Sequence, residues 1–232
     1  LVIYITDLLN IEKDIEKIRE YISNKMILVL NKKDVLPKSV KEEKLVKYLD
    51  IPIQHACGEI LKRMNRRGDK ESLLSLVKKI RATVPDITLR TTLITGFPGE
   101  SEEHYEQLHK FVREAQFDRL GCFTYSAEEG TIAAEMPDQV DEQVKQDRAE
   151  HIMETQLDIA SAKNEAKIGT IEKVLIEGWD DYIKCYYGRS QADAPEIDGK
   201  VFFMAKEQLL IGDFADIQIN DILEYDLLGE QV

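Results

Sequence analysis

Residues 87–100 read ITLRTTLITGFPGE, and this stretch decides the fold. The run from Ile87 to Thr95 is rich in β-branched side chains, which predicts a buried strand. The Gly-Phe-Pro-Gly-Glu that follows predicts a tight turn at the end of that strand. Ser101 then precedes an amphipathic pattern over residues 102–116, which predicts a helix capped by the serine. A strand that leads through a turn into a helix is the repeating unit of a parallel α/β fold.

The same alternation of strand and helix extends from this unit toward the N-terminus and one step beyond it. Pro52 interrupts one of the strands and predicts irregular pairing there. The pattern indicates an α/β fold built from parallel βα units through residue 125. The expected strands cover residues 1–7, 26–30, 49–55 and 119–125, and the expected helices cover residues 11–22, 40–48, 58–66 and 71–83.

The pattern of the sequence changes after a long stretch at residues 143–167 that predicts a helix. Beyond Gly169 it consists of short alternating runs separated by turn residues, which is typical of a small antiparallel β-barrel. The expected barrel strands cover residues 170–176, 182–188, 200–204, 213–219 and 222–228.

Length and charge narrow the function. A chain of 232 residues accommodates one generous domain or two small ones. Lys and Arg total 31 against 44 Asp and Glu, giving a net charge of -13, which is the wrong sign for a protein whose main task is to grip phosphate backbones. Residues 168–232 hold 5 basic and 14 acidic side chains, so this segment suits a basic partner, although acidic faces also serve solubility.

The remaining global features indicate a cytoplasmic fragment. No apolar run is long enough to span a bilayer, and the chain starts at Leu1 without a signal-peptide pattern, so we expect a piece of a larger protein and no membrane partner. Cys57, Cys122 and Cys185 lie far apart in the sequence, which predicts neither a disulfide framework nor a zinc site.

From Lys47 onward the sequence resembles the radical-SAM methylthiotransferases, and within them the RimO type that modifies a ribosomal protein. The resemblance is carried by separate blocks that read YLDIPIQHA at 48–56, LKRMNRRG at 61–68, LRTTLITGFPGE at 89–100, FDRLG at 117–121, FTYS at 123–126, EEGT at 128–131, GRSQADAPE at 188–196 and EYDL at 224–227. It implies that residues 48–167 form the later part of a TIM-like radical-SAM barrel and that residues 168–232 form an OB-like TRAM domain.

The resemblance also implies an activity, cofactors and a partner. The family uses S-adenosylmethionine and two 4Fe-4S clusters to add a methylthio group to the β-carbon of an aspartate in the twelfth protein of the small ribosomal subunit. A tRNA methylthiotransferase is the alternative, because related tRNA-modifying members share the sequence of residues 96–100. The acidic C-terminus makes nucleic acid the less expected substrate. The family's CxxxCxxC motif is missing from this sequence, so we expect both clusters to lack ligands here and this chain alone to be inactive.

By the resemblance, the cofactor contacts include Gly96, Phe97, Pro98, Gly99 and Glu100, which would flank the adenine and ribose of S-adenosylmethionine. The alternative is a purely structural strand-to-helix turn in which Glu100 favours the helix N-terminus.

Three further residues are candidates for cofactor contact. Gln54 and His55 lie at a strand end, although a lone histidine is more often a hydrogen-bonded structural residue. Arg90 lies within a strand, and an arginine that points into a barrel needs a carboxylate, either from the cofactor or from an internal Asp or Glu. Cys57 is expected to be a buried thiol rather than a metal ligand.

Candidate substrate contacts lie in two places. Tyr125 and Ser126 end the last strand of the parallel region, where simple edge packing is the alternative. Arg189, Gln191 and Asp193 precede Pro195 in the TRAM-like segment and are candidates for contact with a protein substrate, with turn chemistry as the alternative.

Residues 1–47 resemble a different family. Asn31-Lys32-Lys33-Asp34 follows an apolar strand and is similar to the NKxD guanine-reading motif of circularly permuted ribosome-assembly GTPases. No GxxxxGK[ST] phosphate loop occurs in the sequence. The chain therefore resembles a chimera with a seam near residues 44–49. Its N-terminal piece is predicted either to bind guanine nucleotide or the ribosome, or only to supply βα units in place of missing barrel repeats.

Overall fold

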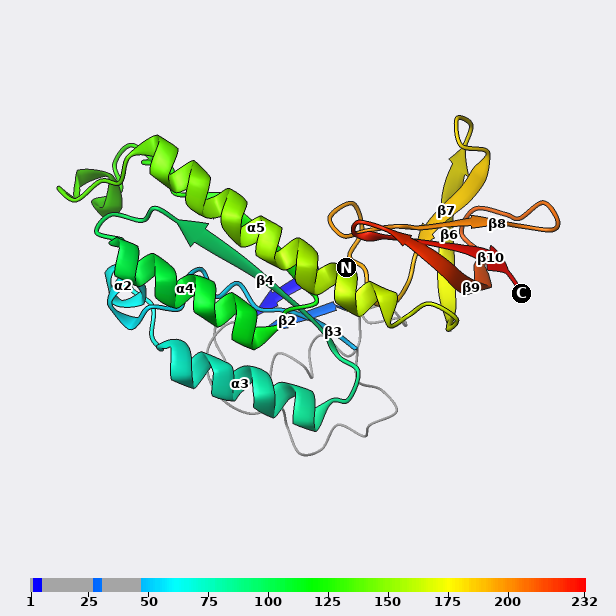
Figure 1. Ribbon diagram of the computed structural model, residues 1–232, viewed down its shortest axis with the longest axis horizontal. Coiled ribbons are helices and arrows are strands. Elements are labelled where there is room, and N and C mark those ends of the chain that lie inside the picture. The colour runs from blue at the N-terminus through cyan, green and yellow to red at the C-terminus, as the bar shows by residue number, and fades with distance from the viewer. Residues whose placement is uncertain (1, 6–26, 31–46) are drawn as a thin grey trace. The chain divides into compact units, whose positions relative to one another are not determined.

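The computed structural model describes residues 2–5, 27–30 and 47–232 (Figure 1). The predicted helix at 11–22, most of the one at 40–48 and the motif at 31–34 lie outside the described residues. The chain divides into two compact units, Leu1–Met153 and Glu154–Val232, each of which is described here by itself.

The first unit is built on parallel strands, as the sequence predicts. A three-stranded sheet has the order β3-β4-β5, and both of its pairs are parallel. A second parallel pair, β1-β2, lies in the N-terminal segment. The strands are β1 (Val2–Ile5), β2 (Ile27–Leu30), β3 (Tyr48–Asp50), β4 (Thr88–Thr95) and β5 (Arg119–Thr124).

Helices follow these strands and bury one face of the sheet. Along β4, Leu89 and Leu93 are fully buried, while Thr92 and Ile94, on either side of Leu93, are partly exposed, because successive side chains of a strand point to opposite faces. In the view of Figure 1, β4 runs between α4 and α5. The helices are α2 (Gly58–Arg63), α3 (Lys70–Thr83), α4 (Glu102–Ala115) and α5 (Glu142–Glu165), with a 3-10 turn at Ile132–Glu135.

Two local predictions can be checked directly. Ser101 caps α4 as predicted, because its Oγ accepts from the backbone N–H of His104 at 3.3 Å. The strand predicted at 49–55 is shorter than expected: β3 ends at Asp50, and a single bridge joins Gln54 to Leu93. Pro52 has no N–H to give to the ladder, and Gln54 has a φ of 74°, so regular pairing does not continue beyond Asp50.

The second unit contains a closed five-stranded barrel in the order β10-β8-β7-β6-β9, which confirms the predicted barrel. Its core consists of alternate strand positions such as Val174 and Ile176 on one strand and Ile217 and Ile219 on another. The strands are β6 (Ile171–Asp180), β7 (Cys185–Arg189), β8 (Val201–Met204), β9 (Phe214–Leu223) and β10 (Asp226–Gln231).

One pair of neighbouring barrel strands departs from antiparallel pairing. Four neighbouring pairs are antiparallel, whereas β10 and β8 are parallel. A closed ring with an odd number of strands cannot alternate direction all the way round, so one parallel pair is unavoidable. The predicted boundaries also shift, since Tyr182 lies in the turn before β7 and β9 continues to Leu223.

The helices of the described part of the chain were also compared with the length and apolarity that a bilayer span requires. None of them meets both conditions.

Candidate active site

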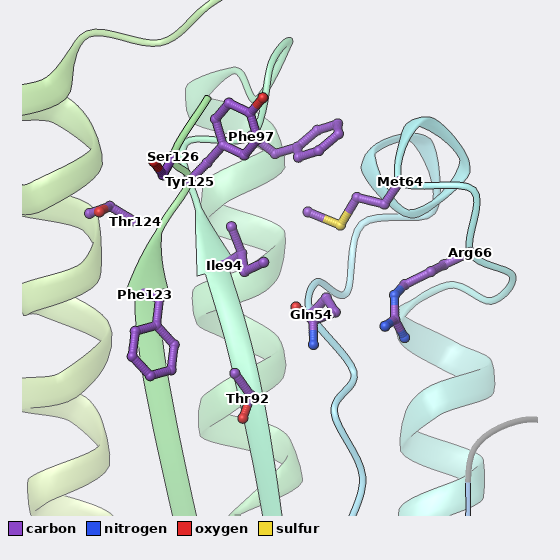
Figure 2. Close-up of a pocket in the computed structure, with 10 residues that line it drawn as sticks. All are labelled: Gln54, Met64, Arg66, Thr92, Ile94, Phe97, Phe123, Thr124, Tyr125 and Ser126. Carbon is purple, nitrogen blue, oxygen red and sulfur yellow. The ribbon is translucent and has the colours of Figure 1, made fainter. Parts of the chain in front are cut away.

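The first unit has a cavity of about 400 Å³ at the carboxyl ends of β4 and β5 (Figure 2). In parallel βα barrels the carboxyl ends of the strands are where active sites form. Its lining residues are Gln54, Met64, Arg66, Thr92, Ile94, Phe97, Phe123, Thr124, Tyr125 and Ser126.

One wall of the cavity is the sheet face that the helices leave free. Thr92 and Ile94 occupy alternate positions of β4 and therefore point the same way. Phe123 on β5 is 60% exposed, which is unusual for so large an apolar side chain. The wall thus offers an aromatic ring and a hydroxyl to a ligand.

The opposite wall comes from the loop after β3 and from the turn that follows α2. Figure 2 shows Gln54, Met64 and Arg66 across the cavity from Phe123 and Ser126. Gln54 is held against β4 on both sides, because its N–H donates to the Thr92 carbonyl at 2.8 Å and its own carbonyl accepts from Ile94 at 2.7 Å. These two bonds keep Gln54 in its positive-φ conformation at the cavity.

Glu100 is the centre of a buried polar network beside this cavity. Its Oε2 accepts from the Gly96 N–H at 3.0 Å and lies 3.2 Å from His55 Nε2, and its Oε1 accepts from Arg148 at 2.9 Å. His55 Nδ1 accepts from the Cys57 N–H at 2.9 Å, so the ring proton on Nε2 is donated to Glu100. Both His55 and Glu100 are buried, and neither lines the cavity.

The two glycines before Glu100 allow protein side chains to approach the turn closely. Gly96 has a φ of 72°, and a Cβ there would lie 2.0 Å from Lys145 Cγ. Gly99 has a φ of 85°, and a Cβ there would lie 2.1 Å from Arg63 Nη1. The tight strand-to-helix turn is therefore present as predicted, and its nearest neighbours are α5 and α2.

Only some of the predicted cofactor contacts line the cavity. Gln54 and Phe97 line the cavity, whereas Gly96, Pro98 and Gly99 form the turn beside it. Arg90 pairs with Asp50, with 2.6 Å between Nη1 and Oδ2. The predicted need for a carboxylate is met by an internal one, which was one of the two alternatives.

Tyr125 and Ser126 line the cavity, at the place where substrate contact was predicted. The Tyr125 ring packs edge-on against Phe97 with 5.2 Å between centroids, and Lys145 Nζ lies 5.4 Å from its ring centroid. Its hydroxyl is buried and has no hydrogen-bond partner among the described residues. A polar group in this state can be satisfied by a ligand or by ordered water.

The predicted contacts of the second unit form local structure. Arg189 pairs with Glu177, and Gln191 is exposed. Asp193 Oδ2 accepts from the Ser190 hydroxyl at 2.6 Å and from its N–H at 3.2 Å. The arrangement around Asp193 is that of a side-chain-stabilised turn, which agrees with the alternative of turn chemistry.

The described residues do not fit an iron–sulfur cluster. Cys57 precedes α2, Cys122 lies in β5 and Cys185 lies in β7 of the other unit. No three His, Cys, Asp or Glu side chains in the described ranges are grouped so that they could hold a metal. Burial raises the pKa of Cys122 to about 12, which keeps it a thiol, and Cys57 is the buried thiol that the sequence predicts.

Sequence reasoning missed several residues of the cavity and of the network beside it. The alternation of side chains along β4 and β5 could have identified Thr92, Ile94 and Phe123 as residues of one sheet face. Arg148 gave no local signal, because it lies 48 positions from Glu100 in the sequence. The other missed lining residues are Met64, Arg66 and Thr124.

Comparisons with known proteins agree with this architecture. The family model described as "Radical SAM superfamily" matches residues 3–112, and the one described as "TRAM domain" matches residues 168–232. The parallel βα unit, its cavity and the barrel thus define a radical-SAM protein with a TRAM domain. The radical-SAM match begins within the segment predicted to be GTPase-like, whose origin stays a prediction.

The similar curated proteins bear the name "Ribosomal protein uS12 methylthiotransferase RimO". The protein from Pelotomaculum thermopropionicum is 52% identical over 200 residues, covering 86% of this chain and 45% of the relative. That from Acetivibrio thermocellus is 46% identical over 199 residues (86% and 44%), and that from Clostridium novyi is 44% identical over 227 residues (96% and 49%). The chain is therefore similar to RimO-type methylthiotransferases and spans somewhat less than half the length of these relatives.

Proposed function

We propose that this chain is part of an enzyme that adds a methylthio group to the β-carbon of an aspartate in ribosomal protein uS12. The observation that carries the proposal is the 46–52% identity to uS12 methylthiotransferases over a stretch that covers 86% of the chain. We also propose that the enzyme works in the cytoplasm, where ribosomal proteins are made and assembled.

In this proposal the first unit holds the reacting groups. The cavity lies at the carboxyl ends of parallel strands, and its lining combines Phe123 with hydroxyl, amide and guanidinium groups. These groups suit a polar side chain and a nucleoside better than a purely apolar ligand. S-adenosylmethionine and iron–sulfur clusters belong to the family's chemistry, and the described residues lack a ligand set for a cluster. We therefore expect this chain alone to bind but not to react.

The second unit would recognise the substrate protein. Residues 168–232 carry 5 basic and 14 acidic side chains, which favours a basic protein and disfavours nucleic acid. The contacts predicted for Arg189 and Gln191 belong to this part of the proposal, whereas Asp193 is held in its turn by Ser190.

A graft tests the proposal. In a chimeric protein, residues 48–232 of this chain replace the matching part of the Pelotomaculum thermopropionicum relative, and the rest of that relative is kept. Mass spectrometry then measures whether the chimeric protein modifies uS12. We expect methylthiolated uS12, with the unaltered relative as the positive control. A graft that carries its clusters, shown by visible absorption, yet methylthiolates tRNA and leaves uS12 unmodified contradicts the proposal and supports the tRNA alternative.

A further inference from the structure

Arg66 is the charged side chain among those that line the cavity; the other lining residues are neutral. It lies on the wall formed by Gln54 and Met64 (Figure 2). A guanidinium in a mostly apolar cavity loses hydration, and that loss is recovered only if an anion or several acceptors meet it.

The protein supplies one acceptor. Arg66 Nη1 donates to the Pro52 carbonyl at 3.0 Å, and within the described part of the chain no carboxylate forms an ion pair with it. Burial lowers the pKa of Arg66 below its usual range, with no neighbouring charge acting in the opposite direction. Since a guanidinium has five N–H donors, most of its hydrogen-bonding capacity is left for a ligand.

Other arginines of the described residues are paired differently. Arg90 meets Asp50 at 2.6 Å, and Arg148 meets Glu100 at 2.9 Å. Both of these ion pairs are partly or fully buried, so each of these two guanidinium groups already has a carboxylate of the protein as its partner. The further arginines paired with a carboxylate are Arg63, Arg81 and Arg189.

We propose that Arg66 binds a carboxylate of the ligand that occupies the cavity, which makes it a specificity-determining residue; this rests on the proposed function. The carboxylate is that of the substrate aspartate or that of the methionine part of S-adenosylmethionine. An arginine fork matches either one with two parallel N–H···O bonds. The Gln54 amide and the Thr92 hydroxyl line the same cavity and can bond the adjoining polar atoms.

The consequence concerns selectivity. A substrate whose target residue is asparagine instead of aspartate offers no carboxylate there, so it would leave Arg66 without that anion. A buried polar group that a wrong ligand leaves unpaired is the strongest basis for discrimination. Arg66 would therefore favour a target aspartate over an asparagine if the substrate supplies the carboxylate.

The test measures binding by the intact 232-residue chain in calorimetry. One arm compares uS12 with a uS12 variant whose target aspartate is asparagine, and the other compares S-adenosylmethionine with decarboxylated S-adenosylmethionine. Each arm uses the wild type, Arg66→Gln and Arg66→Lys. Arg67→Gln is the matched control, because it removes the same charge from the exposed neighbouring residue. Thermal melts report whether each variant is folded.

We expect Arg66→Gln to weaken binding about tenfold or more in the arm whose ligand supplies the carboxylate, and to have little effect on the ligand without it. Arg66→Lys should recover part of the loss, since it restores the charge without the fork. The arm that shows this difference identifies the source of the carboxylate. Equal effects with and without the carboxylate, or a loss that Arg67→Gln reproduces, overturn the role of Arg66.

The outcomes separate this role from the proposed function. If S-adenosylmethionine binds with the expected Arg66 dependence and uS12 does not bind, the role of Arg66 holds and the uS12 proposal fails. If uS12 binds and neither arm depends on Arg66, the proposed function holds and the role of Arg66 fails. Absence of binding in both arms overturns both.

Discussion

His55 Nε2 donates a hydrogen bond to Glu100 Oε2 across 3.2 Å, and both side chains are fully enclosed by protein. The bond joins the loop after β3 to the turn after β4, 45 residues later in the chain. Because the same carboxylate also holds the Gly96 N–H and Arg148, it ties two strand ends to α5. The buried Glu100 carboxylate therefore holds together the loop and the turn that lie beside the cavity.

Replacing that anion should destabilise the first unit strongly. Glu100→Gln leaves Arg148 without its buried partner and places an amide N–H₂ where acceptors are needed, so we expect the free energy of unfolding to fall by about 3 kcal/mol. Denaturant titration followed by circular dichroism measures it.

Glu102→Gln is the control for that experiment. Glu102 pairs with the other terminal nitrogen of Arg148 at 2.9 Å, but its side chain is 70% exposed. Its loss should cost less than about 1 kcal/mol. Equal effects of the two substitutions would show that the burial of Glu100 is not what matters.

Gly96→Ala should be far more damaging than a substitution at another glycine of similar conformation. A Cβ at Gly96 would overlap the side chain of Lys145, which is itself buried. Gly130 also has a positive φ, of 80°, but a Cβ there meets nothing within 4 Å. We expect Gly130→Ala to cost about 1 kcal/mol of backbone strain and Gly96→Ala at least twice that, measured by thermal unfolding. Similar melting temperatures for the two variants would contradict this.

The Cys122 thiol should be unreactive in the folded protein. Burial raises its pKa to about 12, with a smaller raising effect from Glu100 and an opposing one from a hydrogen bond with Thr95. At pH 8 almost none of the Cys122 side chain is thiolate. We therefore expect iodoacetamide to alkylate Cys122 only after the protein unfolds. Peptide mass spectrometry on native and urea-unfolded samples measures the difference, with Cys122→Ser as the control. Rapid labelling of Cys122 in the native protein would refute it.

The same shift predicts a loss of stability at high pH. The thiol pKa is 9.0 in the unfolded chain and about 12 in the folded one, so the unfolded state loses its proton first as pH rises. This contribution to stability is complete below pH 9 and is lost between pH 9 and about 12. Comparing the wild type with Cys122→Ala across this range isolates it, and parallel curves would argue against the shift.

Phe123→Ala should impair binding while leaving the fold intact. Phe123 is 60% exposed at the cavity, so its removal should change the free energy of unfolding by less than about 1 kcal/mol. Binding of uS12 or S-adenosylmethionine should weaken, because the ring supplies much of the apolar wall. Phe117→Ala is the contrast, since Phe117 is fully buried and its loss should cost about 3 kcal/mol or more. Undiminished binding by Phe123→Ala would remove the cavity from the proposal.

Particular residues show how far sequence reasoning reached. The periodicity around Thr88–Thr95 and the Ser101 cap predicted the central βα unit, because these depend on side chains a few positions apart. The need of Arg90 for a carboxylate was foreseen, but its partner Asp50 lies in another strand 40 residues away. The parallel β8–β10 pair followed from barrel closure rather than from any strand's own pattern.

By itself, the sequence determined the order of strands and helices, the caps and turns, the excess of acidic residues at the C-terminus and the family. These features depend on local composition and on sequence similarity to known proteins. Only the tertiary structure decided that Glu100 meets His55 and Arg148, and that Arg66 is left facing a cavity without a carboxylate beside it among the described residues. The physical reason is that burial and pairing of charges arise where segments distant in the chain pack together, and no local pattern records which side chains meet there.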